Sequence, residues 1–547
     1  MSMLALLALS PSASACGGFF CSNDPIDQSA ERILFAQDEE AGEVEAHVQI
    51  FFSGSAEDFA WVVPTPAVPE LFASSDEVFS LLDATTRPRF VLDYEEVNTC
   101  DDDRWWYDYD LALSSSSAPS PENGGVQVVA EEKVGPYDTV TLRARSSDEL
   151  LTWLQDNGFD LPSNLSPALD PYVAEESYFV AMRLQNGKSS GDIQPLGMRY
   201  PSDAISIPIQ LTSIAATPDM RVEAYVLGDH RAVPESYLHV RINEAAIDWF
   251  GGAWNYEEVI TRAADEAGGH AFATDYAGPA DIMAEALDPD RYDTDAVAEA
   301  ATPAEAMEQV MSQFQPTALL MGLLETYMPP PDGVDAQSFY NCVGCYELDE
   351  DYSWDPEGLA DALEERIVAP LAHASDLFGA HRHLTRLTSS LDAVEMTVDP
   401  TFVQNADMTQ VVEHEHVARV LMFCGDGGSW RGSTREFVLS DGRSIRLPSE
   451  EWLHEQGMTE FDYMQALADK AALVIEQTAR TGQPEVIADY NGWADGVAND
   501  LSTEADLIAA DGDDDAKGKG CGCASTHAPG FAGVLAVLAI GLGRRRR

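Results

Sequence analysis

The stretch from residue 43 to residue 52 most constrains what this chain can fold into. Apolar side chains occupy every second position: Val44, Ala46, Val48, Ile50 and Phe52. Polar side chains occupy the positions between them: Glu43, Glu45, His47 and Gln49. A period of two is typical of a β-strand with one face in the core and the other in water. The apolar run at residues 58–64 predicts a second, more buried strand after it.

The charge of the chain narrows the classes of partner. Acidic residues number 94 against 31 basic ones, which gives a formal net charge of -63. Binding of nucleic acid relies on Lys and Arg, so no nucleic-acid partner is predicted. Two interpretations of the negative charge stay open. The charge keeps the protein soluble because like-charged molecules repel one another, or the protein is adapted to high salt, which screens that repulsion.

The order of the elements predicts an α+β fold, with a strand-rich, antiparallel N-terminal half and a more helical C-terminal half. A chain of 547 residues can hold more than one core. We divide it into a signal peptide at 1–15, an α+β domain at 16–330 with an insertion at 101–125, a more helical region at 335–505, an acidic and Gly-rich linker at 506–520 and a tail at 521–547. Within the helical region, apolar residues at helical spacing predict one long helix from Thr459 to Thr481. The sequence leaves open whether the two large regions are separate domains or one interlocked fold.

The N-terminal residues carry the features of a secretory signal. Residues 4–9 form a short apolar core, and Ala13-Ser14-Ala15 supplies the small residues of a cleavage site. Cleavage there would leave Cys16 at the new N-terminus. A disulfide at Cys16 is favoured over a lipid, because Ala13 stands where bacterial lipoproteins usually carry Leu.

The C-terminal residues form a more specific pattern than the N-terminal signal does. Cys521-Gly522-Cys523 is followed by an apolar run at 531–542 and by four basic residues: Arg544, Arg545, Arg546 and Arg547. This order resembles the MYXO-CTERM sorting tail of myxobacterial surface proteins. The resemblance implies that a sorting protease removes the tail in the membrane and that Cys521 or Cys523 becomes the anchor. The apolar run is shorter than the roughly 20 residues of a permanent membrane helix, and the arginines would stay in the cytoplasm. A plain membrane tail is the alternative.

Several segments of the body resemble domain of unknown function family 2330, a group of exported bacterial proteins without an established activity. The segments are 16–21, 28–35, 43–64, 219–228, 230–234, 241–249, 384–387 and 395–400. The resemblance is expected to cover residues 16 to 425, with the insertion at 101–125 as a departure. It implies export and no particular chemistry.

Six cysteines in the body suggest up to three disulfides in an exported protein, with the pairing open. They are Cys16, Cys21, Cys100, Cys342, Cys345 and Cys424. Cys342 and Cys345 form a C-x-x-C motif, but the motif precedes an acidic loop and not an evident helix. A redox motif would place it at a helix N-terminus, which lowers the pKa of the first thiol. A structural disulfide is therefore favoured over a redox role.

Two His-x-His pairs are the candidate metal ligands. They are His381 with His383 and His414 with His416. On a strand this spacing places both imidazoles on one face, where they could hold zinc or copper. If the two pairs met, they would form a four-histidine site. Exposed polar positions are the ordinary interpretation, and no cofactor is predicted apart from a divalent metal at these residues.

The function is predicted mainly from the export signal at the N-terminus and the sorting tail at the C-terminus. The chain has no G-x-S-x-G, H-E-x-x-H or phosphate-loop motif. We therefore expect a non-enzymatic module for binding or envelope structure, anchored at the cell surface or outer membrane. Periplasmic or secreted placement is the alternative. Its expected partners are the membrane, the sorting protease, and a protein or glycan at the aromatic segment 104–109. The second hypothesis is a metal-dependent envelope enzyme using the His-x-His pairs, and the third is a thiol oxidoreductase.

Overall fold

The computed structural model describes residues 27–53, 60–97, 127–157, 165–185, 193–348, 352–425, 429–468 and 470–490. The predicted signal peptide, insertion, linker and sorting tail lie outside these residues. So do the following predicted disulfide and anchor residues: Cys16, Cys21, Cys100, Cys521, Cys523, Arg544, Arg545, Arg546 and Arg547.

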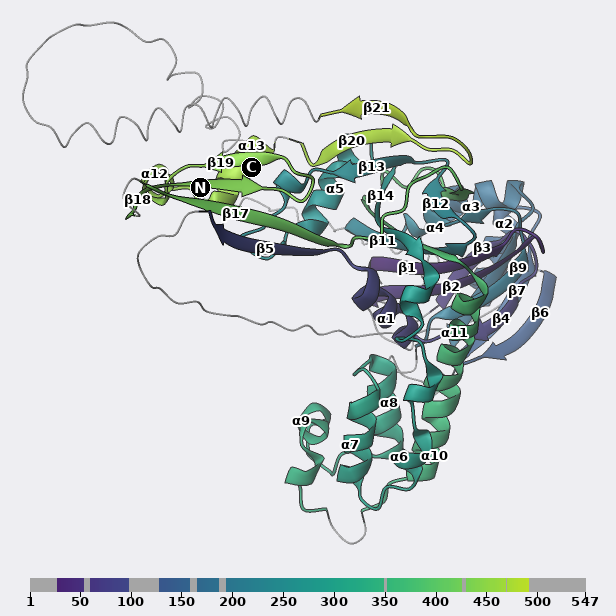
Figure 1. The fold of residues 1–547 in the computed structure, drawn as a ribbon. Helices are drawn as coiled ribbons and strands as arrows, with labels where there is room; N and C mark the ends of the chain where they lie inside the picture. Colours follow the sequence, from purple (N-terminus) through teal and green to yellow (C-terminus); the bar gives the residue numbers. More distant parts are fainter. Residues whose placement is uncertain are drawn as a thin grey trace, which may run out of the picture.

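A large mixed sheet forms the centre of the molecule (Figure 1). Within the described residues it has ten strands in the order β21-β20-β13-β14-β15-β11-β1-β2-β9-β4. The strands are β1 Asp27–Asp38, β2 Glu43–Ser53, β4 Glu70–Ala73, β9 Leu196–Pro201, β11 Ala216–Gly228, β13 Leu238–Ile242, β14 Ala271–Pro279, β15 His383–Leu391, β20 Ala472–Gln477 and β21 Glu485–Asp489. The pairs β1–β11 and β13–β14 are parallel, and the other neighbours are antiparallel.

The two large regions of the chain form one interlocked fold. β15 lies between β11 and β14, although it comes from the region after residue 335. A smaller sheet, which has three strands in the described part, also joins the two regions. Its strands are β10 Ile205–Ser206, β16 Thr401–Asn405 and β12 Arg231–Pro234. The question left open by the sequence is therefore settled by strand pairing.

One face of the central sheet is apolar and packs against a second sheet. The strands of this second sheet, in order, are β3 Ala60–Thr65, β8 Tyr178–Leu184, β7 Tyr137–Arg143 and β6 Gln127–Val134. Ile33, Phe35 and Val48 from the central sheet meet Trp61 and Met182 from the second sheet in one buried cluster. The outer side of the second sheet is covered by α2 (Ser147–Asp156) and α3 (Leu165–Ala174). The apolar side of β2 thus lies in the core, as its alternation predicts.

The other face of the central sheet lies under α1 (Asp76–Thr86) and α11 (Ala369–Ala380). The buried cluster of this side continues into further helices: α6 Thr294–Ala298, α7 Pro303–Gln313, α8 Ala318–Tyr327, α9 Ala336–Asn341 and α10 Pro356–Leu363. Leu34 and Tyr225 from the sheet share a buried cluster with Phe79 of α1 and Leu371 of α11. We call this side the helix-covered face. Figure 1 shows α6 to α10 extending away from the sheet as a bundle.

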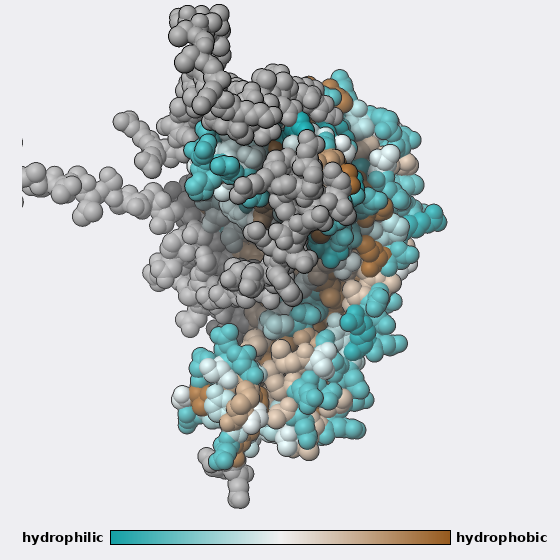
Figure 2. Space-filling view, turned by 60° about the vertical axis from the view of Figure 1, so that its left-hand side comes forward, coloured by the Kyte–Doolittle hydropathy of each residue, from teal (hydrophilic) through white to brown (hydrophobic). Residues whose placement is uncertain are grey.

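The helix-covered face corrects the expectation that the polar side of β2 lies in water. Glu45 is 5% exposed and His47 is 1% exposed. Both sides of this strand are buried, because α1 and α11 cover its polar side. Hydrophilic residues still cover much of the described surface in Figure 2, with a paler apolar area on the helical bundle.

A third part of the molecule contains another four-stranded sheet, counted over the described residues. Its strands, in order, are β19 Ser444–Leu447, β18 Ser429–Val438, β17 Glu415–Gly425 and β5 Arg89–Glu96. Its helices are α5 Tyr256–Glu266, α12 Glu450–Gln456 and α13 Glu460–Leu467. The prediction of one helix from Thr459 to Thr481 is wrong, because α13 ends at Leu467 and β20 begins at Ala472. The run Ala472–Ile475 is fully buried and pairs with β13, which suits a strand between two neighbours.

The α+β class is confirmed, with a strand-rich N-terminal part and helices that come later. At the start of α7, the Thr302 side chain accepts a hydrogen bond from the Glu305 N–H, and Pro303 occupies the first turn. None of the helices in the described ranges is both long enough and apolar enough to cross a membrane.

Candidate metal centre

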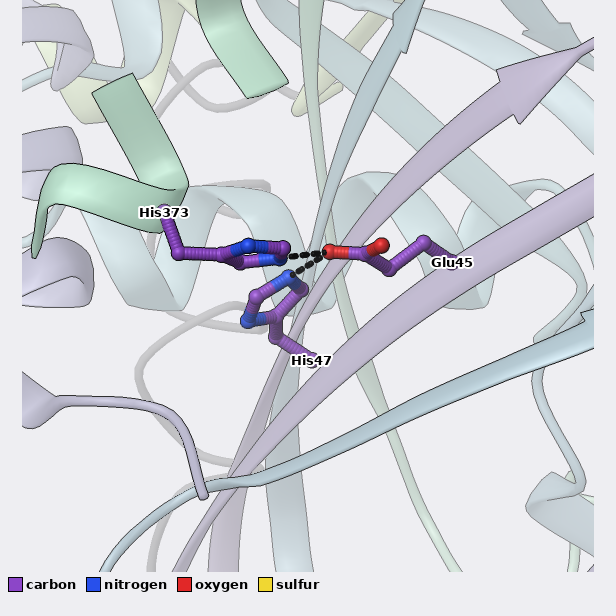
Figure 3. Close-up of side chains that lie close together, drawn as sticks. All are labelled: Glu45, His47 and His373. Atoms are coloured by element: carbon purple, nitrogen blue, oxygen red, sulfur yellow. Dashed lines mark hydrogen bonds and ion pairs between the residues drawn. The ribbon is translucent and has the colours of Figure 1, made fainter. Parts of the chain in front are cut away.

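Three side chains with metal-binding atoms converge on the helix-covered face. Glu45 and His47 are two positions apart on β2, so they point to the same side of the strand. His373 reaches them from α11, which lies across this face (Figure 3). His373 Nε2 lies 2.5 Å and His47 Nε2 lies 3.0 Å from the same atom, Glu45 Oε1. All three candidate ligand atoms lie within 4.8 Å of one another.

The strand register builds the wall beside this group. His47 is opposite Gly197 on β9, and Gly197 is opposite Phe72 on β4. A Cβ atom on Gly197 would lie 2.1 Å from Cε2 of Phe72, so the ring occupies the space that a side chain would need. The Phe72 ring contacts both imidazoles, with centroid distances of 5.4 Å to His47 and 5.1 Å to His373. Gly197 thereby allows an aromatic ring to shield the group on the side of the sheet edge.

Glu45 is held in its ionised form by its partners. Arg199 on β9 donates from Nε and Nη2 to Glu45 Oε2 at 2.9 and 2.6 Å. Burial alone would raise the pKa of Glu45. Hydrogen bonds from His373, His47 and Arg199 outweigh that effect and hold the pKa well below its usual range. A carboxylate that is ionised at all ordinary pH values can serve as a metal ligand.

His47 is held in its neutral form and in a fixed orientation. Burial lowers its pKa, against the opposing effect of Glu45. Its Nδ1 lies 2.7 Å from Ser74 Oγ, while its Nε2 faces Glu45. A second hydrogen bond of this kind is what orients a metal-binding imidazole, and the neutral ring is the form that binds metals.

His373 is positioned by the helical segment before α11. A turn of π-helix at Glu364–Val368 joins α10 to α11, and such turns often occur at functional sites. Arg366 Nε donates to Gln194 Oε1 at 3.1 Å, and Gln194 Nε2 donates to the Ser74 carbonyl at 3.3 Å. The start of α11 is therefore tied to the same residue, Ser74, that orients His47.

Two imidazole nitrogens and one carboxylate oxygen form a set that suits Zn²⁺ and other divalent transition metals. Three protein ligands leave at least one position of a tetrahedral ion for water or another ligand. The side chain of His373 is 38% exposed, against 6% for Glu45, so solvent reaches the group from the side of α11. The same contacts without an ion are two imidazole–carboxylate hydrogen bonds, and a metal measurement distinguishes the two states.

The structure does not bring the predicted His-x-His pairs together. His381 ends α11, where its Nδ1 lies 2.8 Å from the Leu377 carbonyl oxygen. His383 begins β15, is buried, and has no hydrogen-bond partner for Nδ1 within the described part of the chain. Burial lowers the pKa of His383 to about 4.

The second pair lies at the start of β17. The ring of His414 meets the edge of Tyr276 at 6.2 Å. His416 stacks on Phe90 at 4.9 Å, and its Nδ1 lies 2.8 Å from Glu244 Oε1. Among the residues that the structure describes, the one group of three or more metal-binding side chains is Glu45, His47 and His373.

The C-x-x-C cysteines are joined by a disulfide. Cys342 and Cys345 are bonded to each other across a single turn after α9, with a Cα–Cα distance of 5.3 Å. The sequence predicts a disulfide at these cysteines with the partners left open, and the two cysteines of the motif pair with each other. Cys424 lies in β17, and its side chain is outside the described residues.

The sequence contains one local signal for the candidate metal group. Glu45-x-His47 has the same spacing of two as the His-x-His pairs, and on a strand this spacing places both side chains on one face. The alternation with apolar residues, however, predicts that both side chains face solvent. The third member, His373, lies far along the chain, and no local pattern connects it to β2.

Comparison with known proteins places the chain in a bacterial family. The model of a family described as "Uncharacterized protein conserved in bacteria (DUF2330)" matches residues 10–299. The match covers more than half of the chain, and the chain belongs to this family. The sequence motifs predict a resemblance as far as residue 425, whereas the match ends at residue 299. No curated protein and no solved structure matches the chain.

Proposed function

We propose that this member of the DUF2330 family is an exported bacterial protein that binds a divalent transition metal through Glu45, His47 and His373. The observation that carries the proposal is the convergence of two imidazole nitrogens on one buried, ionised carboxylate. Separate elements, β2 and α11, supply these atoms, and Ser74 orients one of the rings. An arrangement with this many fixed partners is pre-organised for an ion.

The charges around the group are compatible with a dication. Arg199 adds a positive charge beside Glu45, but its Nη1 also lies 3.3 Å from Glu70 Oε2. Glu70 and Glu45 together offset Arg199 and leave one negative charge for the ion. The net charge of -63 also raises the concentration of cations near the protein.

The proposal includes export and attachment at the cell surface or outer membrane. The signal at residues 1–15 and the MYXO-CTERM-like tail at 521–547 support it. The Cys342–Cys345 disulfide supports it independently, because disulfides persist in oxidising compartments outside the cytoplasm. A metal-binding module of the envelope is the function that joins these features, and periplasmic or secreted placement is the alternative.

A metal-dependent envelope enzyme is the second candidate, now at Glu45, His47 and His373 in place of the His-x-His pairs. The favouring observation is the combination of three protein ligands with a half-exposed His373, since catalytic zinc sites keep a position open for water. Water bound to such an ion can become a nucleophile near neutral pH. A screen of hydrolytic substrates with the zinc-loaded protein separates the two candidates.

Binding is tested by equilibrium dialysis of the full chain against Zn²⁺, with a chelator as competitor. We expect one tightly bound ion per chain. His373→Gln, a change at a half-exposed position, should weaken binding by at least tenfold, as loss of a ligand or its support does. His381→Gln is the matched control and should bind like the unchanged protein. Equal binding by the two variants would refute the site.

Anchoring is tested by replacing both tail cysteines, Cys521→Ser and Cys523→Ser, in the producing cells. We expect the double variant to leave the outer-membrane fraction and to appear in the medium or periplasm. The matched control, Cys424→Ser, should not change the distribution. Retention of the double variant in the outer-membrane fraction would contradict anchoring through these residues.

A further inference from the structure

A separate cavity of about 290 Å³ lies between α5, β11 and β15, close to the end of α1. None of the three metal-binding residues lines it. Four arginines do: Arg87, Arg221, Arg262 and Arg386. Acidic residues outnumber basic ones three to one in the chain, but the cavity lining contains four of each. The cavity therefore gathers guanidinium groups in a protein that has few of them.

The floor of the cavity is formed by buried charges that are paired with one another. Arg386 is 2% exposed, and its Nη2 lies 2.8 Å from Asp83 and 3.0 Å from Glu223. Its Nε forms an ion pair with Asp275 at 3.2 Å. Glu223 is further paired with Arg32 at 2.5 Å. Arg386 is therefore already paired with carboxylates of the protein. It forms part of the cavity floor and is not expected to bind a ligand carboxylate.

At the mouth of the cavity two arginines meet Glu257, and Arg221 Nε also lies 3.6 Å from Glu223 Oε1. Arg221 Nη1 is hydrogen-bonded to Glu257 Oε1, and Arg87 Nη2 lies 3.9 Å from the same oxygen. Each guanidinium carries five N–H donors, so Glu257 and Glu223 together engage only part of the donors of Arg87 and Arg221. Glu257 and Arg87 have more than half of their side chains exposed. A second carboxylate would find donors on both arginines, in the place that Glu257 now occupies.

Hydroxyl groups line the wall beside these arginines. Thr261 Oγ1 donates to Ser390 Oγ at 2.8 Å, and Ser390 Oγ donates to the Asp219 carbonyl at 3.0 Å. A hydroxyl oxygen can accept two hydrogen bonds, so this wall keeps acceptors for hydroxyl or ammonium groups. The cavity volume is at the lower end for small-molecule sites.

We propose that this cavity binds a small polar carboxylic acid of the size of one sugar acid or one amino acid. The carboxylate binds Arg87 and Arg221 in place of Glu257, and the hydroxyl or amino groups face Thr261 and Ser390. Glu257 acts as an internal competitor for the same donors. The proposal does not depend on the metal site, because the two sites share no residue.

Isothermal titration of the full chain with D-glucuronate, L-alanine and inorganic phosphate, at constant ionic strength, tests this inference. We expect saturable binding of glucuronate or alanine. The compound that binds shows whether the ligand is a sugar acid or an amino acid. Arg87→Gln should weaken that binding about tenfold, because a charge-assisted hydrogen bond is lost. Glu257→Gln should strengthen it several-fold, because the competitor loses its charge. Arg419→Gln, which removes a surface partner of Glu95, is the matched control and should have no effect.

Three results would overturn the inference. They are no saturable binding of either carboxylic acid, binding of phosphate alone, and an affinity that Arg87→Gln leaves unchanged. Weaker binding after Glu257→Gln would overturn the competitor role. Thermal unfolding of each variant checks that it is folded. We expect both variants to fold, because Arg87 and Glu257 are exposed and substitutions at exposed positions usually cost little stability.

Discussion

Glu31 and Glu45 lie on opposite faces of the central sheet, and both are almost completely buried, with 3% and 5% exposure. Their pKa values move in opposite directions. Glu31, on the apolar face, has Gln28 and Thr212 as its hydrogen-bonding side chains within the described residues, and burial raises its pKa to about 7. Glu45, on the helix-covered face, is held ionised by two imidazoles and a guanidinium. Burial sets the cost of a charge, and the partners decide whether the charge is kept.

The same difference applies to the two faces as a whole. The apolar face packs Ile33, Phe35 and Val48 against a second sheet and gains its stability from dispersion and loss of apolar surface. The helix-covered face also has an apolar cluster, but in addition it buries Arg386 among three carboxylates, and these charges depend on their pairing. Substitutions on the two faces should therefore differ in how their effects depend on pH.

The largest effect is expected at Arg386. Arg386→Met would leave Glu223, Asp275 and Asp83 without their shared cation, at a cost of about 3–5 kcal/mol in the free energy of unfolding. The loss should shrink as the pH falls, because the carboxylates can then be protonated in the folded state. Urea unfolding at pH 7.5 and pH 5 measures both quantities.

The matched control on the apolar face is the neighbouring Leu387→Ala, which should cost about 2–5 kcal/mol by opening a cavity. Its cost should be the same at both pH values. If both substitutions had the same pH dependence, the distinction between the two faces would be lost.

A smaller effect is expected at Glu31. Its pKa in the folded state, about 7, lies above the ordinary value of 4.5, so the folded protein holds the proton more tightly than the unfolded chain. The corresponding stability is complete below pH 4.5 and is lost as the pH rises to about 7, by roughly 3 kcal/mol. Glu31→Gln should remove this loss, so that the variant is more stable than the unchanged protein at pH 8.

The control for Glu31 is Glu43→Gln at the exposed start of β2, which should leave the pH profile of unfolding unchanged. A pH profile that Glu31→Gln does not alter would show that the carboxylate on the apolar face has a partner that keeps it charged.

The smallest effect is expected at Gly197. Gly197→Ala places a Cβ atom where the Phe72 ring lies, so the ring must move at a cost of about 1–3 kcal/mol. Because that ring shields His47 and His373, zinc affinity should fall as well. Gly379→Ala in α11 has open space around it and should be neutral or slightly stabilising. Equal stability and zinc affinity of the two variants would contradict the role of Phe72.

Local patterns predicted one face of the sheet and not the other. The alternation from Val44 to Phe52 identified the apolar side of β2. The same alternation placed Glu45 and His47 in water, because nothing between residues 43 and 52 records that α11 covers them. Burial of a polar face is decided by tertiary packing, and a period of two reports only that the two faces differ.

The candidate site was limited in the same way. Glu45-x-His47, His381-x-His383 and His414-x-His416 are equivalent as local signals, since each offers two ligands at a spacing of two. A third ligand distinguishes the first pair from the other two, and this ligand, His373, is brought to β2 by the packing of α11 on the sheet. The error in the helix predicted from Thr459 has a related cause, because a buried run of apolar residues fits a helix and a central strand alike.

The metal content of the protein as isolated from its producing cells tests the central claim most directly. Native and denatured mass spectra should differ by one divalent transition metal per chain, and His47→Gln should abolish the difference while His416→Gln keeps it. A native mass without metal after zinc loading, or loss of the ion in His416→Gln instead of His47→Gln, would contradict the assignment to Glu45, His47 and His373.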